Sequence, residues 1–480
     1  MSFINKLLNI IILLCVYLSR DFIVGAQERE SGKVDYHTIQ LSSLSPSSSC
    51  VHSSKEYVTK SSLRVVHKHG ACSPFGSGKA VKLDHADILR RDQARVNSIH
   101  SKQSNNLGDR LTQTGSKDLP VKDEIKSKED LGSGSYIVTI GIGTPEHSQP
   151  LIVDTGSDLT WTKCRQCGRY TSIKCHSKDK LIFNPSFSTS FDTVSSTSPV
   201  CSDLRSADIH RDCRAPRCCY GIKYTDTSSS YGFLAKEKFT VTSADVFDGI
   251  HFGCSENEAK INGKTAGVLG LSRHVLSFPS QTAKTYNNIF SYCLPSSGRT
   301  GLLTFGSTGI SKSVRFTPMI TLPDTPYLYG LDIVGITVGG KKLEIPSTVL
   351  SKPRAIIDSG TVITRLPPKA YAALRSAFKE NMRNYTTTSG VELLDTCYDP
   401  KGFDTMAVPK VSFSFRGGTT VELGLNGILY PYDASHVCLA FAGNDNDGVF
   451  AIFGSVQQMT LQVVYDKAGG RIGFAQNGCS

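Results

Sequence analysis

The sequence lacks the features that mark most metal, nucleotide and membrane proteins. It holds 15 cysteines, but Cys164-Arg-Gln-Cys167 is its only Cys-x-x-Cys unit, whereas a zinc site built from such units needs a pair of them. None of its 42 glycines belongs to a phosphate-binding loop. Beyond the N-terminus, no apolar stretch approaches the length of a membrane span. We therefore expect no metal, no cofactor and no internal membrane-spanning helix.

The N-terminal residues have the order of a secretory signal. Lys6 precedes the apolar run Leu7–Ser19, which is short for a bilayer span, and Val24–Ala26 offers small residues before a cut. We expect a signal peptide at residues 1–26, with an uncleaved anchor as the alternative.

Twelve cysteines then fall within Cys164–Cys479, and an even number on a secretory route suggests six disulfides.

Residues 27–119 are polar, basic and poor in aromatic side chains. They include a strand-like patch at Ser62–Gly70 and a helical stretch around Ala86–Ile99, and we expect an exposed linker at Ser101–Lys128. The formal charge of the chain is +11, and more than half of this excess lies before residue 120. A separable basic segment ahead of a globular body suggests a propeptide, with a disordered arm as the alternative. The rest of the chain is too weakly basic to indicate a nucleic-acid partner.

From Tyr136 onward, short apolar runs alternate with Gly, Pro and Ser clusters, which is typical of β strands and turns. The clearest alternation is at Tyr136–Gly143. One helical pattern, at Pro367–Tyr385, has a clear apolar face. We predict a mostly β protein with small helices. The apolar face of the predicted helix consists of Tyr371, Leu374, Phe378 and Met382.

An internal repeat indicates the architecture. Leu151–Ser157 reads LIVDTGS and Ala355–Thr361 reads AIIDSGT, so each is an apolar strand that runs into Asp-Thr/Ser-Gly. Each copy has a later apolar partner that ends in glycine, at Val268–Gly270 and Ile452–Gly454. We infer two related β lobes, each of which contributes one aspartate.

These motifs predict a pair of carboxylates, Asp154 and Asp358, at the ends of buried strands. Two close carboxylates cannot both ionise, so they share one proton. The ionised member can then activate a water while the protonated member polarises a carbonyl, as in the well-known dyads of proteases. This chemistry predicts no acyl-enzyme and an acidic pH optimum. Two structural turn aspartates are the alternative.

The motifs resemble those of plant aspartic proteases of the nepenthesin-like, A1B type, over essentially the whole chain. The resemblance implies a bilobal pepsin-like fold, with an N-terminal lobe at 120–318, a C-terminal lobe at 319–480 and an active-site cleft between them. The most specific stretches are Asp154–Trp161, Gly267–Leu271, Phe290–Pro295, Asp358–Thr361, Ile452–Gln458 and Ile472–Ala475.

The resemblance further implies an aspartic endopeptidase made as a zymogen, which acts on proteins or peptides as a monomer. We expect its propeptide at 27–119 and a cut between about Asp118 and Ser133. The signal favours a secreted, apoplastic protein, with vacuole and plastid as alternatives. The patch Val65–Cys72 resembles a subgroup with members described as chloroplast-nucleoid proteases.

Position by position, the resemblance gives each motif residue a role, and Asp154 and Asp358 match the catalytic pair. The flap that covers such a pair carries a tyrosine, matched by Tyr224 and supported by Trp161. The other matches are Thr155 and Ser359, which interlock the two loops; Gly156 and Gly360, which bind substrate backbone; and Ser157 and Thr361, which occupy the outer hydrogen-bonding positions.

The resemblance also implies a disulfide pattern. In the insert that contains Cys201, Cys213, Cys218 and Cys219 the chain departs from the family, and only a Cys201–Cys213 bond is suggested there. The implied pairs are Cys164–Cys167, Cys175–Cys254, Cys293–Cys479 and Cys397–Cys438.

The flap is the second region in which the chain departs from the family pattern. Family flaps usually read Tyr-Gly-Asp-Gly-Ser, whereas this chain has Thr225 and Thr227 in place of both glycines. Because β-branched residues resist positive φ, we expect a stiffer or differently shaped flap. We predict altered specificity or reduced turnover, with the dyad chemistry retained.

A catalytically inactive relative that binds a partner protein is the competing function, because xylanase-inhibitor-like plant proteins share this fold. Such relatives usually lose catalytic-loop residues, whereas this chain keeps both loops, so only the altered flap supports that alternative.

One glycosylation sequon, Asn384–Thr386, lies at the end of the predicted helix.

Overall fold

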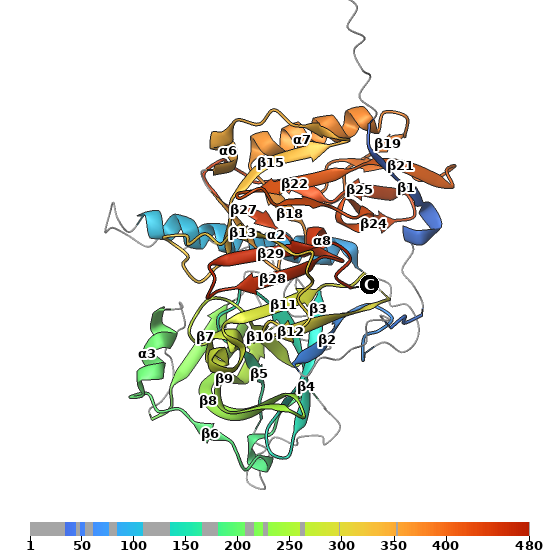
Figure 1. Cartoon of the computed structure of the whole chain (residues 1–480). Coiled ribbons are helices and arrows are strands. Elements are labelled where there is room, and N and C mark those ends of the chain that lie inside the picture. Colours follow the sequence, from blue (N-terminus) through green and yellow to red (C-terminus); the bar gives the residue numbers. More distant parts are fainter. Residues whose placement is uncertain are drawn as a thin grey trace, which may run out of the picture.

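The computed structural model describes residues 34–44, 49–52, 61–75, 84–108, 135–165, 181–206, 216–223, 229–259, 265–296, 298–351 and 354–479. The fold is mostly β, as predicted, and its strands form two halves, one above the other in Figure 1. The predicted signal peptide at 1–26 lies outside the described residues.

The first half is organised by a 14-stranded sheet, which also receives the last two strands of the chain. Small helices fill its connections: η2 (Pro185–Phe187), α3 (Pro199–Ser206), α4 (Phe278–Gln281) and α5 (Ala283–Tyr286). Its strands are β2 (Ser62–His67), β3 (Tyr136–Ile142), β4 (His147–Asp154), β5 (Trp161–Lys163), β6 (Asp192–Thr193), β7 (Cys219–Lys223), β8 (Ser229–Thr242), β9 (Asp245–Ala259), β10 (Gly267–Gly270), β11 (Ile289–Cys293), β12 (Thr300–Phe305), β13 (Arg315–Pro318), β28 (Gln462–Asp466) and β29 (Arg471–Ala475).

The second half contains three smaller sheets. The first consists of β14 (Gly330–Leu331), β17 (Ala355–Ile357), β27 (Ala451–Phe453), β18 (Thr364–Leu366) and β26 (Phe441–Gly443). The second consists of β16 (Lys341–Lys342), β15 (Ile333–Val338), β22 (Val411–Phe415) and β23 (Thr420–Glu422). The third consists of β19 (Thr387–Thr388), β20 (Cys397–Tyr398), β25 (His436–Leu439) and β24 (Leu429–Asp433). The helices are α6 (Ser347–Ser351), α7 (Pro368–Asn381), η3 (Leu425–Gly427) and α8 (Ser455–Gln458).

Helix α7 forms where the sequence predicts a helix. Pro368 occupies its first turn, where proline's fixed φ suits a helix and its missing N–H costs nothing. The side chains of Tyr371, Leu374 and Phe378 are buried, and Met382 is buried directly after the helix. The predicted apolar face is therefore confirmed.

The predicted repeat is visible in the strand register. Strand β10 runs parallel to β4, with Gly270 opposite Asp154. In the same way β27 runs parallel to β17, and the backbone N–H of Asp358 donates to Phe453 O at 3.1 Å. In the first half Asp154 and Gly270 end their strands, and in the second half Asp358 and Gly454 directly follow theirs, so the two aspartates hold equivalent positions.

The described residues before 109 pack against both halves. Strand β2 lies between β12 and β3 and is antiparallel to both, while β1 (Tyr36–Gln40) pairs with β21 (Thr405–Pro409) and is followed by η1 (Leu41–Leu44). Helix α2 (His85–Gly108), light blue in Figure 1, crosses the middle of the molecule.

Helix α2 is longer than predicted, and the expected linker is wrong over its first residues. Residues 101–108 continue the helix, and Gln103 is buried. Its side chain donates to Gly448 O and accepts from Phe450 N, both at 3.0 Å. These contacts with the second half favour helix over linker because they satisfy polar groups that would otherwise be buried unpaired.

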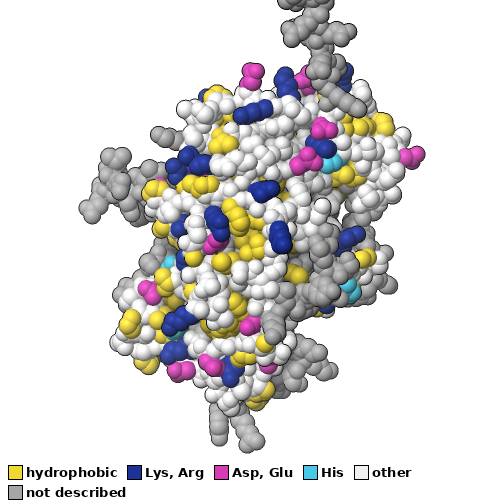
Figure 2. All heavy atoms as spheres, in the orientation of Figure 1, with side chains coloured by type: hydrophobic (Ala, Val, Ile, Leu, Met, Phe, Trp, Pro, Cys, Tyr) yellow, Lys and Arg dark blue, Asp and Glu magenta, His cyan; other side chains and the backbone are white. Residues whose placement is uncertain are grey.

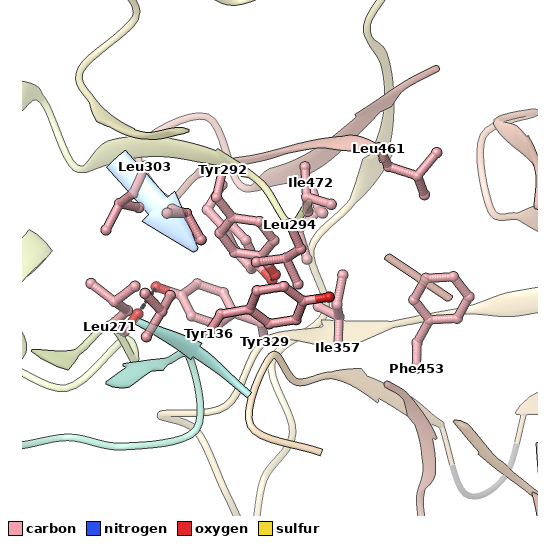
Figure 3. Close-up of a cluster of buried hydrophobic side chains, with 14 of the residues drawn as sticks. Tyr136, Leu271, Tyr292, Leu294, Leu303, Tyr329, Ile357, Phe453, Leu461 and Ile472 are labelled. Carbon is pink, nitrogen blue, oxygen red and sulfur yellow. Dashed lines mark hydrogen bonds between the residues drawn. The ribbon is translucent and has the colours of Figure 1, made fainter. Parts of the chain in front are cut away.

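The largest apolar cluster extends across both halves. Figure 3 shows its centre, where Tyr292 and Tyr329 meet side chains from the first half, such as Leu303, and from the second, such as Ile357. The hydroxyl of Tyr329 donates to Leu271 O at 2.8 Å, so this buried polar group is satisfied.

The structure keeps two of the implied disulfides and corrects the others. Cys293–Cys479 and Cys397–Cys438 are bonded as the resemblance implies. Cys164 is bonded to Cys254, so neither Cys164–Cys167 nor Cys175–Cys254 is correct. Cys201 is bonded to Cys218, so Cys201–Cys213 is also wrong. The bond Cys50–Cys72 was not predicted.

The Cys164–Cys254 bond has a simple structural reason. Strands β5 and β9 are parallel, with Thr162 opposite Cys254, and Cys164 follows β5 directly. The backbone N–H of Cys164 donates to Ser255 O at 2.7 Å, which holds the two cysteine Cα atoms 5.2 Å apart. Residues 166–180, which contain Cys167 and Cys175, lie outside the described residues.

One face of the molecule can be judged for its charge. On the face shown in Figure 2, Lys and Arg side chains are spread among acidic and apolar ones. Within the described part of the chain, no helix has the length and apolar character needed to cross a membrane.

Candidate active site

The two aspartates of the repeat lie on loops that face one another. Asp154 ends β4 and is 3% exposed, and Asp358 follows β17 and is 1% exposed. Each strand is apolar and fully buried at this end, so the fold places both carboxylates deep inside the protein. Burial of two acidic groups requires compensating donors or cations.

The two loops are interlocked by the residues that follow the aspartates. The backbone N–H of Thr155 donates to Ser359 Oγ at 3.1 Å, and the backbone N–H of Ser359 donates to Thr155 Oγ1 at 2.9 Å. The hydroxyl of Ser359 also donates to Val153 O at 3.1 Å. Each hydroxyl thus serves the opposite loop.

Each carboxylate also receives hydrogen bonds from its own loop. Asp154 accepts from the Gly156 backbone N–H at 2.9 Å and from the Ser157 hydroxyl at 2.5 Å. Asp358 accepts from the Gly360 backbone N–H at 3.2 Å and from the Thr361 hydroxyl at 2.6 Å. The two halves of the site therefore have the same pattern.

Both loop glycines are required by close approach. A Cβ atom on Gly156 would lie 2.9 Å from Asp358 Oδ1, and one on Gly360 would lie 2.7 Å from Asp154 Oδ1. These separations are shorter than van der Waals contact. A larger residue at either position would push the carboxylates apart.

Gln458, at the end of α8, supports the second loop from behind. Its side-chain amide donates to Asp358 O at 3.2 Å and to Phe453 O at 2.8 Å. The hydroxyl of Tyr292 donates to Gln458 Oε1 at 2.5 Å and shares a hydrogen bond with the hydroxyl of Tyr465. These residues fix the backbone beneath the carboxylates.

A guanidinium from helix α2 lies between the two aspartates. Arg95 donates to Asp154 through Nη2 at 2.7 Å and Nη1 at 3.1 Å. It donates to Asp358 through Nε at 2.9 Å and Nη2 at 3.0 Å. All three guanidinium nitrogens thus bind the dyad, which is the fork geometry in which arginine pairs best with carboxylates.

This ion pair changes the charge state of the site. Burial by itself would raise the pKa of Asp358, but the Arg95 guanidinium and the hydrogen bonds from Thr361 and Gly360 outweigh it, so the pKa lies below its usual range. Burial would likewise lower the pKa of Arg95, but the two aspartates hold it well above its usual value. The two shifts favour the ionised carboxylate of Asp358 and the charged guanidinium of Arg95.

Helix α2 is anchored along its length. It starts after Asp84, whose Oδ1 accepts from the Asp87 N–H at 3.0 Å, as expected of a helix cap. Leu89 has no exposed surface and lies in an apolar cluster with Val362. Val96, two turns later, lies in another with Phe450. Arg95 is therefore held in place by the packing of its own helix.

The structure brings together most, but not all, of the predicted site residues. The motif residues from Asp154 to Ser157 and from Asp358 to Thr361 converge as described above. Trp161 is fully buried in a cluster with Tyr220. Tyr224, Thr225 and Thr227 lie outside the described residues. Asn384 lies on an exposed turn after α7.

Sequence reasoning predicted a basic propeptide but did not identify Arg95. The available signal was a cation on the apolar side of a predicted helix, next to Val96.

Among the described residues, no group of His, Cys, Asp and Glu side chains could hold a metal ion.

Two family models match the chain in succession, the xylanase inhibitor N-terminal model at residues 136–307 and the C-terminal model at 328–476. An aspartyl protease family protein of Arabidopsis thaliana is 60% identical over the full length of both chains, and aspartyl protease AED1 of the same plant is 55% identical. Aspartic proteinase nepenthesin-2 of Nepenthes gracilis is 36% identical over 72% of this chain and 78% of its own. The chain therefore belongs to the plant pepsin-like aspartyl protease family.

Solved structures support the same fold. The protein edgp matches with a TM-score of 0.59 and 19% identity, over 72% of this chain and 92% of that one. Basic 7S globulin from soybean matches with a TM-score of 0.56 and 19% identity, over 71% of this chain and 91% of its own. The chloroplast-nucleoid subgroup stays an expectation.

Proposed function

We propose that this chain is the inactive precursor of an aspartic endopeptidase, with Asp154 and Asp358 as its catalytic pair. The observation that carries the proposal is the interlocked arrangement of two equivalent, buried carboxylates that share one cation from α2. Without Arg95, two carboxylates this close share one proton. That charge state is the one that acid–base hydrolysis needs.

In the active form a water would take the place of the guanidinium between the carboxylates. The ionised aspartate removes a proton from the water as its oxygen attacks the peptide carbonyl, and the protonated aspartate donates its proton to the carbonyl oxygen. Collapse of the resulting tetrahedral species, with a proton transferred to the amide nitrogen, breaks the C–N bond. No covalent enzyme intermediate forms.

Arg95 explains why the precursor would be inactive. Its guanidinium binds both carboxylates, balances one of their two negative charges, and would occupy the place where the water must bind. Residues 27–119 would then act as a propeptide, released after a cut between about Asp118 and Ser133. Protein or peptide chains are the proposed substrates, and we propose that the enzyme is a monomer.

The proposed enzyme would follow the secretory route to the apoplast, with vacuole or plastid as alternative destinations. The disulfides of the described residues suit an oxidising compartment. The exposure of Asn384 supports its glycosylation.

A second candidate is an inactive protein that binds a partner, because the matching family models are named for xylanase inhibitors. Against it, the chain retains both aspartates, both loop glycines and both interlocking hydroxyls. A protein that only bound a partner would have no need of this geometry.

The test is cleavage of acid-denatured globin by the acid-processed chain, with and without pepstatin. We expect cleavage below about pH 5 that pepstatin blocks and that Asp154→Asn and Asp358→Asn both abolish. Equal cleavage by Asp154→Asn and wild type, or none by either, would contradict the proposal. The matched control is Asp158→Asn, because Asp158 lies outside the dyad and pairs with Ser272.

A further inference from the structure

A second charged contact of helix α2 lies beside the candidate dyad. Asp92 is fully buried, and its Oδ2 accepts from Arg365 Nη2 at 2.9 Å. The same carboxylate accepts from the backbone N–H groups of Val362, at 2.6 Å, and Ile363, at 3.2 Å. One carboxylate of the proposed propeptide is thus bound by a guanidinium and two backbone donors.

The groups that bind Asp92 belong to the enzyme body. Val362 and Ile363 directly follow the catalytic loop, and Arg365 lies on β18, where it is 1% exposed. Arg365 Nη1 donates to Ile363 O at 2.9 Å, which fixes the side chain, while Nη2 points to the helix and reaches only Asp92 and, at 3.4 Å, Gln93. Removal of the helix would leave this cation with no carboxylate partner among the described ion pairs.

A buried cation without a partner is costly. Loss of one partner of a buried, hydrogen-bonded ion pair leaves the other charge uncompensated in a low-dielectric site. The three donors around Asp92 would therefore favour any new carboxylate that enters the space left by α2. Asn or Gln could accept the same hydrogen bonds but would leave the charge of Arg365 unbalanced.

We propose that Arg365, with the N–H groups of Val362 and Ile363, forms a substrate pocket that selects an acidic side chain close to the cleaved bond. The inference rests on the proposed function and adds a substrate class to it: polypeptides with Asp or Glu at a defined position. In the precursor, Asp92 occupies this pocket in the place of the substrate carboxylate.

The spacing of the helix indicates where this acidic residue lies. Asp92 precedes Arg95 by three residues, about 4.5 Å along a helix. An extended peptide advances about 3.3 Å per residue. A substrate side chain in the pocket therefore belongs to a residue about one to three positions from the cleaved bond, on the side of the site occupied by Val362.

The test uses the enzyme obtained by acid processing of the full-length chain, with quenched fluorescent peptides that differ in one residue. Glu, Gln and Lys are placed in turn at each of the four positions on either side of the cleaved bond, and kcat/KM is measured at pH 5, where most free Glu is ionised. At one position we expect Glu to exceed Gln by about tenfold or more, since hydrogen bonds to charged groups are the stronger class. Lys should be the poorest.

Two further measurements connect the preference to Arg365. The variant Arg365→Lys keeps a cation beside the substrate carboxylate and should retain a Glu/Gln ratio above one. The variant Arg365→Met should show a ratio near one at pH 5. Arg375→Met is the matched control, since Arg375 pairs with Asp395 on the surface, and it should keep the wild-type ratio.

The outcomes separate this inference from the proposed function. If no peptide is cleaved, the proposed function is wrong and the pocket has no substrate. If peptides are cleaved but the wild type shows no Glu preference at any position, the protease stands and the pocket inference is wrong. The Glu/Gln ratio of the wild type needs no variant, so a misfolded Arg365→Met protein would not leave the question open.

Discussion

The backbone N–H of Ser359 donates a 2.9 Å hydrogen bond to Thr155 Oγ1, although the two residues lie 204 positions apart in the chain. The reciprocal bond from Thr155 N to Ser359 Oγ completes the interlock. The relative position of the two carboxylates therefore depends on these two hydroxyls. Because the two loops come from different halves of the protein, the interlock joins the halves as well as the two carboxylates.

The first prediction concerns this interlock. Thr155→Val keeps the shape of the side chain but removes the acceptor, so the buried N–H of Ser359 loses its partner at a cost of about 1–3 kcal/mol. A small displacement of one carboxylate relative to the other should lower kcat by about 100-fold. Thr155→Ser, which keeps the hydroxyl, is the control and should retain most activity. Near-normal kcat in Thr155→Val would show that the interlock does not position the dyad.

The second prediction concerns the proposed role of Arg95 as an internal inhibitor. In Arg95→Gln the two carboxylates lose their shared cation, and their mutual repulsion should weaken the docking of α2. We expect this precursor to process itself at a pH at least one unit higher than the wild-type precursor does. Gel electrophoresis and N-terminal sequencing would monitor the processing. Arg90→Gln is the matched control, because Arg90 is on the same helix but is exposed and, within the described part of the chain, forms an ion pair with Asp87 alone. If both variants process at the wild-type pH, Arg95 is not the restraint.

The repeat and the dyad could be predicted because they are local patterns. An apolar strand that runs into Asp-Thr/Ser-Gly can be read directly, and its occurrence twice indicates two related halves. The same reasoning predicted the face of α7 from Tyr371 and Phe378, because helical spacing is also local.

The disulfide of Cys164 and the position of Arg95 could not be predicted in this way. Cys164 meets Cys254 because β5 and β9 pair in parallel, and nothing in the spacing of cysteines reveals a strand register. Arg95 reaches the aspartates only because Leu89 and Val96 seat the helix in two apolar clusters of the second half. Both depend on long-range packing.

The third prediction concerns the flap, which lies outside the described residues. Thr225 and Thr227 stand where the family usually has glycine, and glycine permits the positive φ and close approach that β-branched residues resist. We expect the double variant Thr225→Gly with Thr227→Gly to raise kcat/KM or to broaden peptide specificity. Thr225→Ser with Thr227→Ser removes the branch but not the Cβ atom, and it serves as the control. An unchanged kcat/KM across a peptide panel would argue against any effect of the two threonines.

The last prediction concerns the pH at which α2 leaves its site. Burial lowers the pKa of His85 and of His100, and it lowers the pKa of His67 in β2 to about 3. The docked segment therefore binds fewer protons than the released one, so docking weakens as the pH falls below about 6.5. The low pKa of Asp358 acts in the same direction at lower pH, since the ionised pair with Arg95 is lost on protonation.

The charges around these histidines do not all act alike. For His85, burial outweighs the opposing effect of Asp84 and Asp433. For His100, burial and Arg365 outweigh the Phe450 carbonyl and Asp445. Asp92 opposes release, because burial raises its pKa and its docked form takes up a proton first. We expect the histidines and Asp358 together to outweigh Asp92, so that acid favours release.

His100→Gln tests this balance. Glutamine can still donate to Phe450 O, which His100 Nε2 contacts at 3.0 Å, but it cannot become charged. We expect the midpoint pH at which the segment is released to fall by a few tenths of a unit. Limited proteolysis of α2 would measure this release. His52→Gln, at an exposed position before β2, is the control and should release at the wild-type pH. A midpoint that stays fixed or rises in His100→Gln would mean that protonation of this histidine does not drive release.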